Sequence, residues 1–563
     1  MPATLGNRLI LGTPLTGARR DLELTPVDRS KHVYVVGSSG QGKSKFLEGL
    51  VRQDIGQWPR SKCGLILIDP DGPIFDGVMH WLATNSFLVD RPVIPIDFRR
   101  KDFVVSYNPL RPRPDVESSV VVNNFVSAVA HVWGDDSVDK TPLFARYAKS
   151  LFQALYERGG SVVDAVFFLD QAERKLRAAM IQDIQDSDSR AAWQYVHDLK
   201  PDRFMDELGS TIRRLHPFTY NRFLRGVFGA AGPSLDLLEA LEEGQIILVC
   251  LSQERGNIDQ TDAQLFATTL LADLWQTAGQ RGKRDDVKPF YVYIDEFQEY
   301  LTPTIATTFA RARGYGLHFT LAHQFPSQVK DHGGTGKRIF DSILGNAETV
   351  VAFQQKHRDD LALLADRLFG ATFDPFKEKL RINTTKVVDY ERIILQGSTR
   401  SESSGSSMTS AGESLLYDEE GNITGRIENQ SSSSGEGATS ESTSSHEALA
   451  PVLGEELSSV TFLSVEDQRL LAMVALETQG ERHAVTRLKN GAPVAFRTEV
   501  IKARAVGPHW AETYHLRLLQ NLASALPFSQ AIEAIEERHH ALRRQDELSL
   551  DDEAPARRRL RKP

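Results

Sequence analysis

The chain has 563 residues, which is enough for two or three domains. Hydrophobic residues make up 41% and charged residues 25% of the chain, a composition typical of a soluble globular protein with a sizeable core. The formal net charge of −9 at pH 7 argues against nonspecific adhesion to nucleic acid. It does not exclude a local basic channel, because a focused field matters more than the sum of charges.

No segment of the sequence is typical of export or membrane insertion. Residues 1–20 lack the apolar stretch of a signal peptide, and no run reaches the roughly eighteen apolar residues of a membrane span. The two cysteines, Cys63 and Cys250, lie beside apolar runs without disulfide or metal-ligand spacing. We therefore expect a cytoplasmic protein with buried thiols and no integral membrane segment.

Residues 31–114 alternate between strands and helices. The apolar runs HVYVVG, GLILIDPDGP and RPVIPIDF are separated by stretches that can form helices. Continuous apolar strands with intervening helices predict a parallel sheet of an α/β protein.

The turn after the first of these strands fits the phosphate-binding pattern G-x-x-x-x-G-K-[ST]. A buried strand precedes the turn and a helix follows it, as the motif requires. Glycines allow backbone N–H groups to wrap a phosphate, Lys43 would neutralise the β- and γ-phosphates of ATP, and the Ser44 hydroxyl would bind Mg²⁺. The alternative is a surface turn that matches by chance. The predicted nucleotide-binding residues are Gly37, Ser38, Ser39, Gly40, Gln41, Gly42, Lys43 and Ser44.

Residues 115–240 have helical periodicity and predict an all-helical insertion within the nucleotide-binding core. Within it, the stretch STIRRLHPFTYNRFLRGVF alternates basic and aromatic residues. This pattern suits DNA backbone contacts with stacking on unpaired bases, whereas helical spacing equally allows aromatic residues in the core and arginines in solvent. The candidate DNA-binding residues are Arg213, Arg214, Arg222 and Arg225.

Strand-like runs return after residue 241, and one of them ends in two acids. In PFYVYIDEFQEYL the strand ends at Asp295 and Glu296. Asp295 would organise Mg²⁺, and Glu296 would polarise the attacking water as a general base. A paired Asp-Glu favours an ATPase over a small-molecule kinase. The alternative is that the two acids cap the following helix.

Residues 398–446 are rich in Ser, Gly, Thr and Glu and predict a disordered linker, or else a mobile docking loop. Within them, LLYDEEGNITGRIEN could form a hairpin. After them we expect a helix capped by Ser464, a hairpin at Asn490 and Gly491, and a final helix followed by a disordered tail that ends in ARRRLRK.

Taken together, these motifs resemble the HerA/FtsK superfamily of P-loop motors, and within it the TraG/TraD-like coupling ATPases of type IV secretion and conjugation. The resemblance covers roughly residues 8–397 and rests on the order of KHVYVVGSSGQGKS, LIDPDGP, SYNPLRP, IILVCLS, YVYIDEFQEYL, ARARGYGLHFTLAHQFPSQV and ILGNAETVVAF. Such proteins usually begin with transmembrane helices or a β-barrel, and this chain reaches its phosphate loop by Gly37. We therefore expect a motor of this family without a membrane anchor.

The resemblance implies a RecA-like core that assembles into a hexameric ring and translocates DNA. Gln324 matches the family's sensor glutamine, and Arg313 matches the arginine that reaches a neighbouring subunit's nucleotide, with Arg311 as a second candidate. Solvated arginines and a strand-end amide are the alternatives for these positions. Asp69 matches a family acid whose role the sequence does not assign.

The expected organisation is an N-terminal arm, a two-part RecA-like core around the helical insertion, a linker, and a small C-terminal α+β region with a tail. The arm is 1–30, and the core is 31–114 and 241–397, with the helical insertion at 115–240 between its two parts. The linker is 398–446, the C-terminal region 447–545 and the tail 546–563. The leading hypothesis is an ATP- and Mg²⁺-dependent DNA translocase that acts in conjugative transfer or DNA processing with a relaxase, nuclease or secretion channel. The alternatives are a protein-remodelling ring that does not bind DNA and a nucleotide-gated interaction protein.

Overall fold

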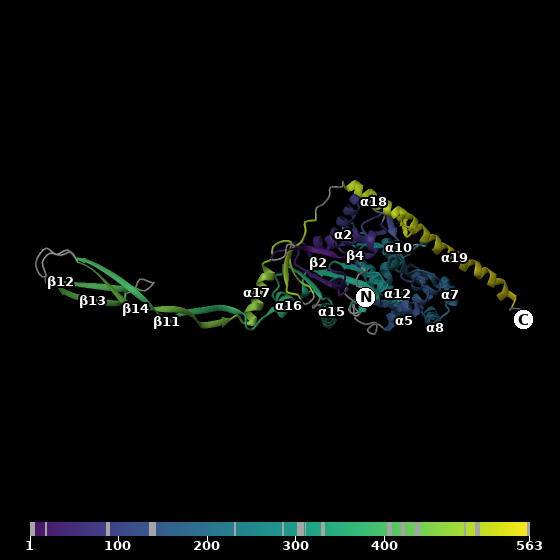
Figure 1. Ribbon diagram of the computed structural model, residues 1–563. Coiled ribbons are helices and arrows are strands. Elements are labelled where there is room, and N and C mark those ends of the chain that lie inside the picture. The colour runs from purple at the N-terminus through teal and green to yellow at the C-terminus, as the bar shows by residue number, and fades with distance from the viewer. Residues whose placement is uncertain are drawn as a thin grey trace. The chain divides into compact units, whose positions relative to one another are not determined.

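The structure is a computed structural model of the chain (Figure 1). It describes residues 6–16, 20–85, 91–133, 142–229, 232–283, 286–300, 309, 311–327, 333–401, 408–417, 423–433, 440–488, 491–501 and 507–559. The chain divides into two compact units, one of residues 1–373 with 468–563 and the other of residues 374–467.

A large mixed sheet organises the first unit. From β10 (Thr349–Phe353) the strands run parallel through β3 (Val33–Val36), β9 (Leu317–His323), β8 (Phe290–Ile294), β4 (Leu65–Asp69), β7 (Ile246–Cys250) and β5 (Val93–Asp97). The predicted α/β fold with a parallel sheet is confirmed. Because the strands are parallel, their carboxyl ends share one edge, where the candidate site lies.

Four further strands extend this sheet in antiparallel fashion beyond β10. They are β15 (His483–Arg487), β16 (Val494–Arg497), β1 (Leu9–Pro14) and β2 (Leu22–Leu24). The sequence predicted a separate N-terminal arm and a separate C-terminal region, whereas the structure places strands from both in the core sheet. The strands of the predicted 490–491 hairpin pair as expected, although Asn490 lies outside the described residues.

Helices cover both faces of the sheet, because residues of one strand alternate between them. On β3, Val33 and Val35 pack in one buried cluster with α2 (Lys43–Ser61) and α3 (Pro73–Asn85), while Tyr34 and Val36 pack in the other. The second cluster includes α12 (Gln260–Arg281), α15 (Gly333–Asn346) and α16 (Arg358–Phe369). The strand that leads into the phosphate-binding loop is thus held between two buried hydrophobic clusters.

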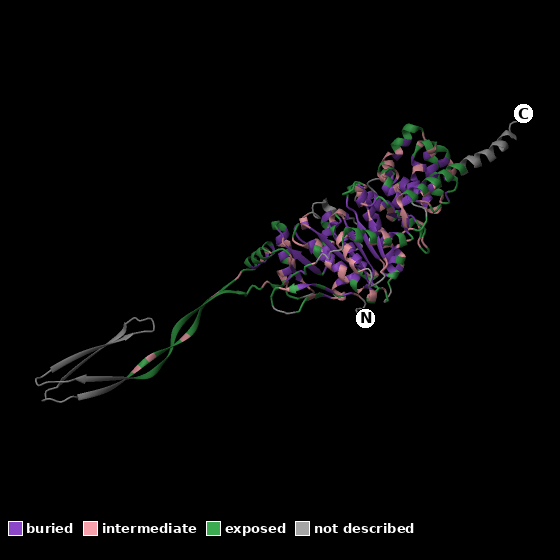
Figure 2. Cartoon of the chain, turned by 90° about the horizontal axis from the view of Figure 1, so that it is seen from above, coloured by how far each residue is buried: buried purple, intermediate pink, exposed green. Residues whose placement is uncertain are grey.

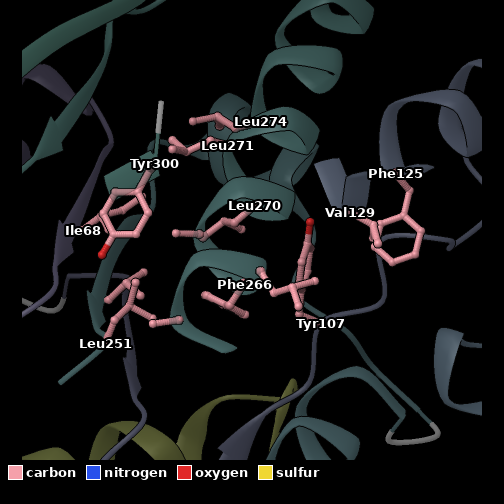
Figure 3. Packing of buried hydrophobic residues seen from close by; sticks show 14 of the residues in the cluster. Ile68, Tyr107, Phe125, Val129, Leu251, Phe266, Leu270, Leu271, Leu274 and Tyr300 are labelled. Carbon is pink, nitrogen blue, oxygen red and sulfur yellow. The ribbon is translucent and has the colours of Figure 1, made fainter. Parts of the chain in front are cut away.

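The described residues of the insertion between β6 (Phe103–Val105) and β7 form helices joined by turns and loops and include no strand, as predicted. Its helices are α4 (Ser118–Val132), α5 (Pro142–Glu157), α6 (Val166–Leu169), α7 (Arg174–Gln182), α8 (Ser187–Asp198), α9 (Pro201–Tyr220), α10 (Arg222–Gly229) and α11 (Leu237–Glu243). Figure 3 shows Phe266 and Leu270 of α12 in one cluster with Ile68 of the sheet and Val129 of α4. The insertion therefore shares the core of the sheet.

The C-terminal helix α19 (Phe528–Arg559) ties the insertion to the rest of the unit. It follows α18 (Pro508–Asn521) and β17 (Ala525–Pro527), which pairs with β6. Arg538 of α19 donates to Asp164 Oδ1 at 2.8 Å, and His539 Nε2 lies 2.9 Å from the same oxygen. The sequence predicted a disordered tail from residue 546, but the backbone is helical to Arg559.

The second unit consists of antiparallel ribbons. β11 (Glu378–Ser401) pairs with β14 (Ser440–Phe462), and β12 (Met408–Tyr417) pairs with β13 (Ile423–Ser433). These strands differ from the predicted disordered linker, because cross-strand pairing uses backbone groups that polar residues also carry. The predicted LLYDEEGNITGRIEN hairpin is confirmed in its strands. Figure 2 colours residues 378–394 of β11 and 447–462 of β14 mostly as exposed.

After β14 the chain forms α17 (Val465–Glu477). The Asp467 backbone N–H donates to Ser464 Oγ at 3.0 Å, so the predicted N-cap is confirmed. No described helix is both long enough and apolar enough to cross a membrane.

Candidate nucleotide-binding site

The phosphate-binding loop joins β3 to α2 at the carboxyl edge of the sheet. A Cβ added to Gly37 would lie 2.5 Å from Phe353 Cβ, so only glycine allows this close approach to β10. Gly42 has φ +96° and caps α2 without a side-chain hydrogen bond. The first-turn N–H groups of this helix are therefore available for an anion.

Lys43 and the two acids of β8 converge in a buried cluster. Lys43 Nζ lies 2.5 Å from Glu296 Oε1 and 3.5 Å from Asp295 Oδ1. All three side chains are buried. The carboxylates therefore face the phosphate loop, and the interpretation that they merely cap the next helix lacks support.

Ser44 completes an oxygen pair suited to a magnesium ion. Its hydroxyl donates to Asp295 Oδ2 at 3.1 Å. Burial raises the pKa of the Asp295 carboxyl, and the Lys43 ammonium opposes this shift. Hydroxyl and carboxylate oxygens are the ligands that Mg²⁺ prefers, with phosphates and water filling the remaining positions. The residues present therefore fit the predicted metal ion.

Glu296 is held in a strained and specific position. Its φ of +44° is unusual for a residue with a side chain. Gln298 Nε2 donates to Glu296 Oε2 at 2.9 Å, and Gln324 Nε2 lies 3.4 Å from Oε1. Strained backbone that is fixed by several contacts is concentrated at functional sites. The predicted sensor glutamine thus lies beside the predicted base.

Gln324 is in turn positioned by a residue that the sequence analysis missed. Gln355 is fully buried, and its Nε2 donates to the Gln324 backbone carbonyl at 3.0 Å. It follows the carboxyl end of β10, as Asp295 follows β8. The rule that polar residues at the ends of neighbouring parallel strands meet at one edge could have identified it.

Asp69 has a local structural role. Its carboxylate accepts backbone N–H bonds of 2.8–3.2 Å from the turn that opens α3. Burial raises its pKa to about 6, and those hydrogen bonds oppose the shift. Asp69 therefore fixes the turn beside the site.

The two arginines matched by resemblance lie away from this cluster. Arg311 and Arg313 are exposed near the start of β9, around the short 3₁₀ helix η5 (Ala312–Tyr315). Arg313 lies near His32, which precedes β3, and its charge contributes to the lowered pKa of that histidine. Both arginines thus lie toward the amino-terminal ends of the strands, opposite the phosphate loop.

The four candidate DNA-binding arginines lie on α9 and α10. Arg213 and Arg222 are exposed, and the guanidinium of Arg222 lies 5.5 Å from the centre of the Phe528 ring. Arg214 lies 5.0 Å from the centre of the Phe144 ring, and Arg225 is half-buried.

The aromatic residues of the same stretch are mostly unavailable to bases. Phe218, Phe223 and Phe228 are buried in the core, and Tyr220 is 76% exposed. Of the two interpretations of this stretch, the structure supports core packing rather than base stacking for the three phenylalanines, because their helices bury that face.

The comparison with known families bears on the second half of this site. Residues 289–420 match the family described as the TraM recognition site of TraD and TraG. This stretch is TraG/TraD-like. It contains Asp295, Glu296 and Gln324, so the resemblance that the sequence predicted is confirmed over these residues. Among curated proteins, none matches the sequence.

Several solved structures resemble the chain at low identity. The plasmid coupling protein TrwB in complex with a non-hydrolysable ATP analogue has 12% identity and a TM-score of 0.49, over 88% of this chain and 95% of that one. The unbound bacterial conjugative coupling protein TrwBdeltaN70 has 10% identity and a TM-score of 0.46, over 88% and 94%. VirB4 of Thermoanaerobacter pseudethanolicus has 14% identity and a TM-score of 0.41, over 64% and 87%. Likeness at this level does not transfer an activity.

Proposed function

We propose that the protein hydrolyses ATP and uses the energy to move DNA. The observation that supports this proposal most directly is the convergence of Lys43, Asp295 and Glu296 at the carboxyl edge of the sheet. A buried lysine facing two acids at the end of a glycine-rich loop supports phosphoryl transfer to water, because it places a cation at the phosphates and carboxylates at the metal and the water.

The side chains divide the work of hydrolysis. Lys43 and the N–H groups of the loop bind the β- and γ-phosphates and stabilise charge that develops on them. Glu296 orients a water molecule and accepts its proton, and Gln324, beside Glu296, senses the γ-phosphate. Ser44 and Asp295 would hold Mg²⁺, which when bound supplies further neutralisation of phosphate charge.

We infer that the active form is a homo-oligomeric ring, a hexamer by the family resemblance. The exposed Arg313 lies at the sheet edge opposite the phosphate loop of its own chain. It therefore suits a role at the nucleotide of a neighbouring subunit, where an arginine stabilises transition-state charge. If each nucleotide needs an arginine from the neighbouring subunit, ATP hydrolysis depends on assembly of the ring.

The substrate we propose is DNA, in conjugative or mobile-element transfer. The TraG/TraD-like match over residues 289–420 supports this. Arg213 and Arg222 are the exposed candidates for phosphate contacts, which would carry no sequence preference.

The description of the matched family also suggests a protein partner. It names a TraM recognition site in TraD and TraG. We propose that this chain contacts a DNA-processing partner, such as a relaxase, a nuclease or a secretion channel, through the same region. We place it in the cytoplasm, since the two free, buried cysteines suit a reducing compartment.

Steady-state ATP hydrolysis with and without single- and double-stranded DNA tests the proposal. We expect DNA to stimulate turnover, and Lys43→Ala and Glu296→Gln to abolish the stimulated rate. Hydrolysis that is indifferent to both DNA forms would contradict the translocase and favour a protein-remodelling ring. Turnover that survives Glu296→Gln would contradict the assigned base.

A further inference from the structure

A segment far away in the sequence contacts the phosphate-binding loop directly. The backbone N–H of Arg482, which precedes β15, donates to the Gln41 carbonyl at 3.1 Å. A Cβ added to Gly42 would lie 3.4 Å from Arg482 Cγ. The stem of Arg482 therefore packs beside the residue that caps α2.

Arg482 is fixed at this position by its own strand pair. Its carbonyl accepts from the Thr498 backbone N–H at 2.9 Å and from Thr498 Oγ1 at 3.3 Å. Its guanidinium donates through one Nη to the Thr498 carbonyl. The residue has φ +63°, a conformation that side chains rarely adopt.

The guanidinium keeps donor capacity that these contacts do not use. Arg482 Nε is buried and has no hydrogen-bond partner among the described residues. A buried donor without a partner is costly, and a ligand or water that accepts from it offsets that cost. The side chain that carries this group passes Gly42 of the phosphate-binding loop at its Cγ.

The charges of the described site are unbalanced, and a second cation would neutralise the excess negative charge. Lys43 faces both Asp295 and Glu296, so two carboxylates accompany one ammonium group. A nucleoside di- or triphosphate adds several negative charges. Arginine is suited to phosphate because its planar donors match the oxygen geometry and its charge is permanent.

We propose that Arg482 contacts the polyphosphate of a bound nucleoside di- or triphosphate and that the strand pair β15–β16 exists in part to present it. This inference rests on the proposed nucleotide site and extends it to the region after residue 467. Because Arg482 contacts the base of the loop rather than Gln324, it binds ADP and ATP alike. Uniform binding of this kind lowers KM and leaves kcat unchanged.

Two variants distinguish the effect of the Arg482 guanidinium from the effect of the backbone conformation at this position. Arg482→Gly removes the side chain and suits the left-handed φ, whereas Arg482→Gln keeps the stem beside Gly42 and removes the charge. Lys62→Gly is the matched control, because Lys62 is exposed, has φ +52° and caps the far end of α2.

The measurement is the Kd for fluorescent mant-ADP and mant-ATP with the full chain. We expect both Arg482 variants to weaken both ligands by about tenfold, as loss of a charge-assisted hydrogen bond predicts. Lys62→Gly should stay within about twofold, because a distant C-cap glycine costs little. In hydrolysis, the Arg482 variants should raise KM with little change in kcat.

Three results would overturn the inference, and they differ in what else they contradict. If the Arg482 variants bind both nucleotides as the native chain does while Lys43→Ala loses binding, Arg482 is no ligand and the nucleotide site stands. If the native chain binds neither nucleotide, the proposed function fails together with this inference. A loss confined to kcat would also contradict it.

Discussion

Arg313 and Gln324 lie at opposite ends of strand β9. The strand has seven residues, Leu317–His323, and at about 3.3 Å per residue its ends are about 20 Å apart. Gln324 lies beside Glu296 at the carboxyl edge, and Arg313 lies just before the strand begins. Within one chain, therefore, Arg313 and Gln324 are too far apart to contact the same nucleotide.

We expect Arg313→Ala to lower kcat for ATP by about a thousandfold while mant-ATP affinity stays near native. The physical reason is that an arginine supplied by a neighbour stabilises charge only in the transition state. Steady-state hydrolysis and nucleotide binding measured on one preparation check both parts. Lys283→Ala is the control, because Lys283 is exposed near η5, with its Nζ 5.1 Å from the centre of the Tyr315 ring.

Mixing variants distinguishes action between subunits from action within one. Arg313→Ala and Lys43→Ala are each inactive alone in this scheme. A mixed ring contains interfaces with an intact Lys43 on one side and an intact Arg313 on the other, so activity should return. Absence of any recovery on mixing would refute the role between subunits, and Arg311→Ala would then be tested in the same way.

Glu296→Gln should lower turnover by at least about a hundredfold and leave ATP binding intact. An amide cannot accept the proton of water, yet its oxygen still accepts from Lys43, so the variant removes the general base together with one negative charge beside Lys43. The measurement is single-turnover hydrolysis. The control is Glu299→Gln, in η4 (Phe297–Tyr300), since no bond to Lys43 is found for Glu299 in the described structure. Equal losses in the two variants would contradict the assignment.

Gln355→Leu should lower kcat about tenfold or more without weakening nucleotide binding. The change removes the bond that fixes the Gln324 carbonyl, and small displacements of catalytic groups are costly. Gln354→Leu is a close control, because Gln354 Nε2 donates to the Glu477 carbonyl at 2.8 Å and not to Gln324. A purely structural role for Gln355 would lower the melting temperature and leave kcat of the folded fraction unchanged.

Stability should fall as the pH is lowered from about 6.5 towards 4, in part through His32. Burial is the main cause that lowers its pKa from 6.5 to about 4. Its Nδ1 accepts from the Phe319 N–H at 3.2 Å, and its Nε2 lies 2.9 Å from the Phe309 carbonyl, so the folded state needs the neutral ring. The unfolded chain binds the proton first. The neutral ring contributes about 3 kcal/mol to the free energy of unfolding. This contribution is fully present above pH 6.5 and is lost as the pH falls to about 4.

His32→Asn tests this dependence. Asparagine tolerates the φ of +62° at this position but does not titrate. Urea unfolding at several pH values between 4 and 7 should show a lower stability at pH 7 and a flatter decline for the variant. Parallel curves for the two proteins would show that His32 does not carry the effect.

The sequence alone was sufficient for the centre of the candidate site. The phosphate loop is a local motif, and its strand and helix are set by residues within about twenty positions. Asp295 and Glu296 follow an apolar strand, so the parallel-sheet rule brings them to the edge where Lys43 lies. The helical insertion and the α/β class follow from periodicity in the same way.

Only the tertiary structure decided how the distant parts complete the site. Strand pairing joins residues hundreds of positions apart, and no local signal in residues 480–498 indicates that β15 would pair with β10 or that Arg482 would contact Gly42. The same holds for the pairing of β11 with β14, whereas the sequence did indicate the hairpin of β12 and β13. Local patterns fix the elements and the chemistry within one loop, whereas the choice among competing long-range partners depends on the packing of the whole unit.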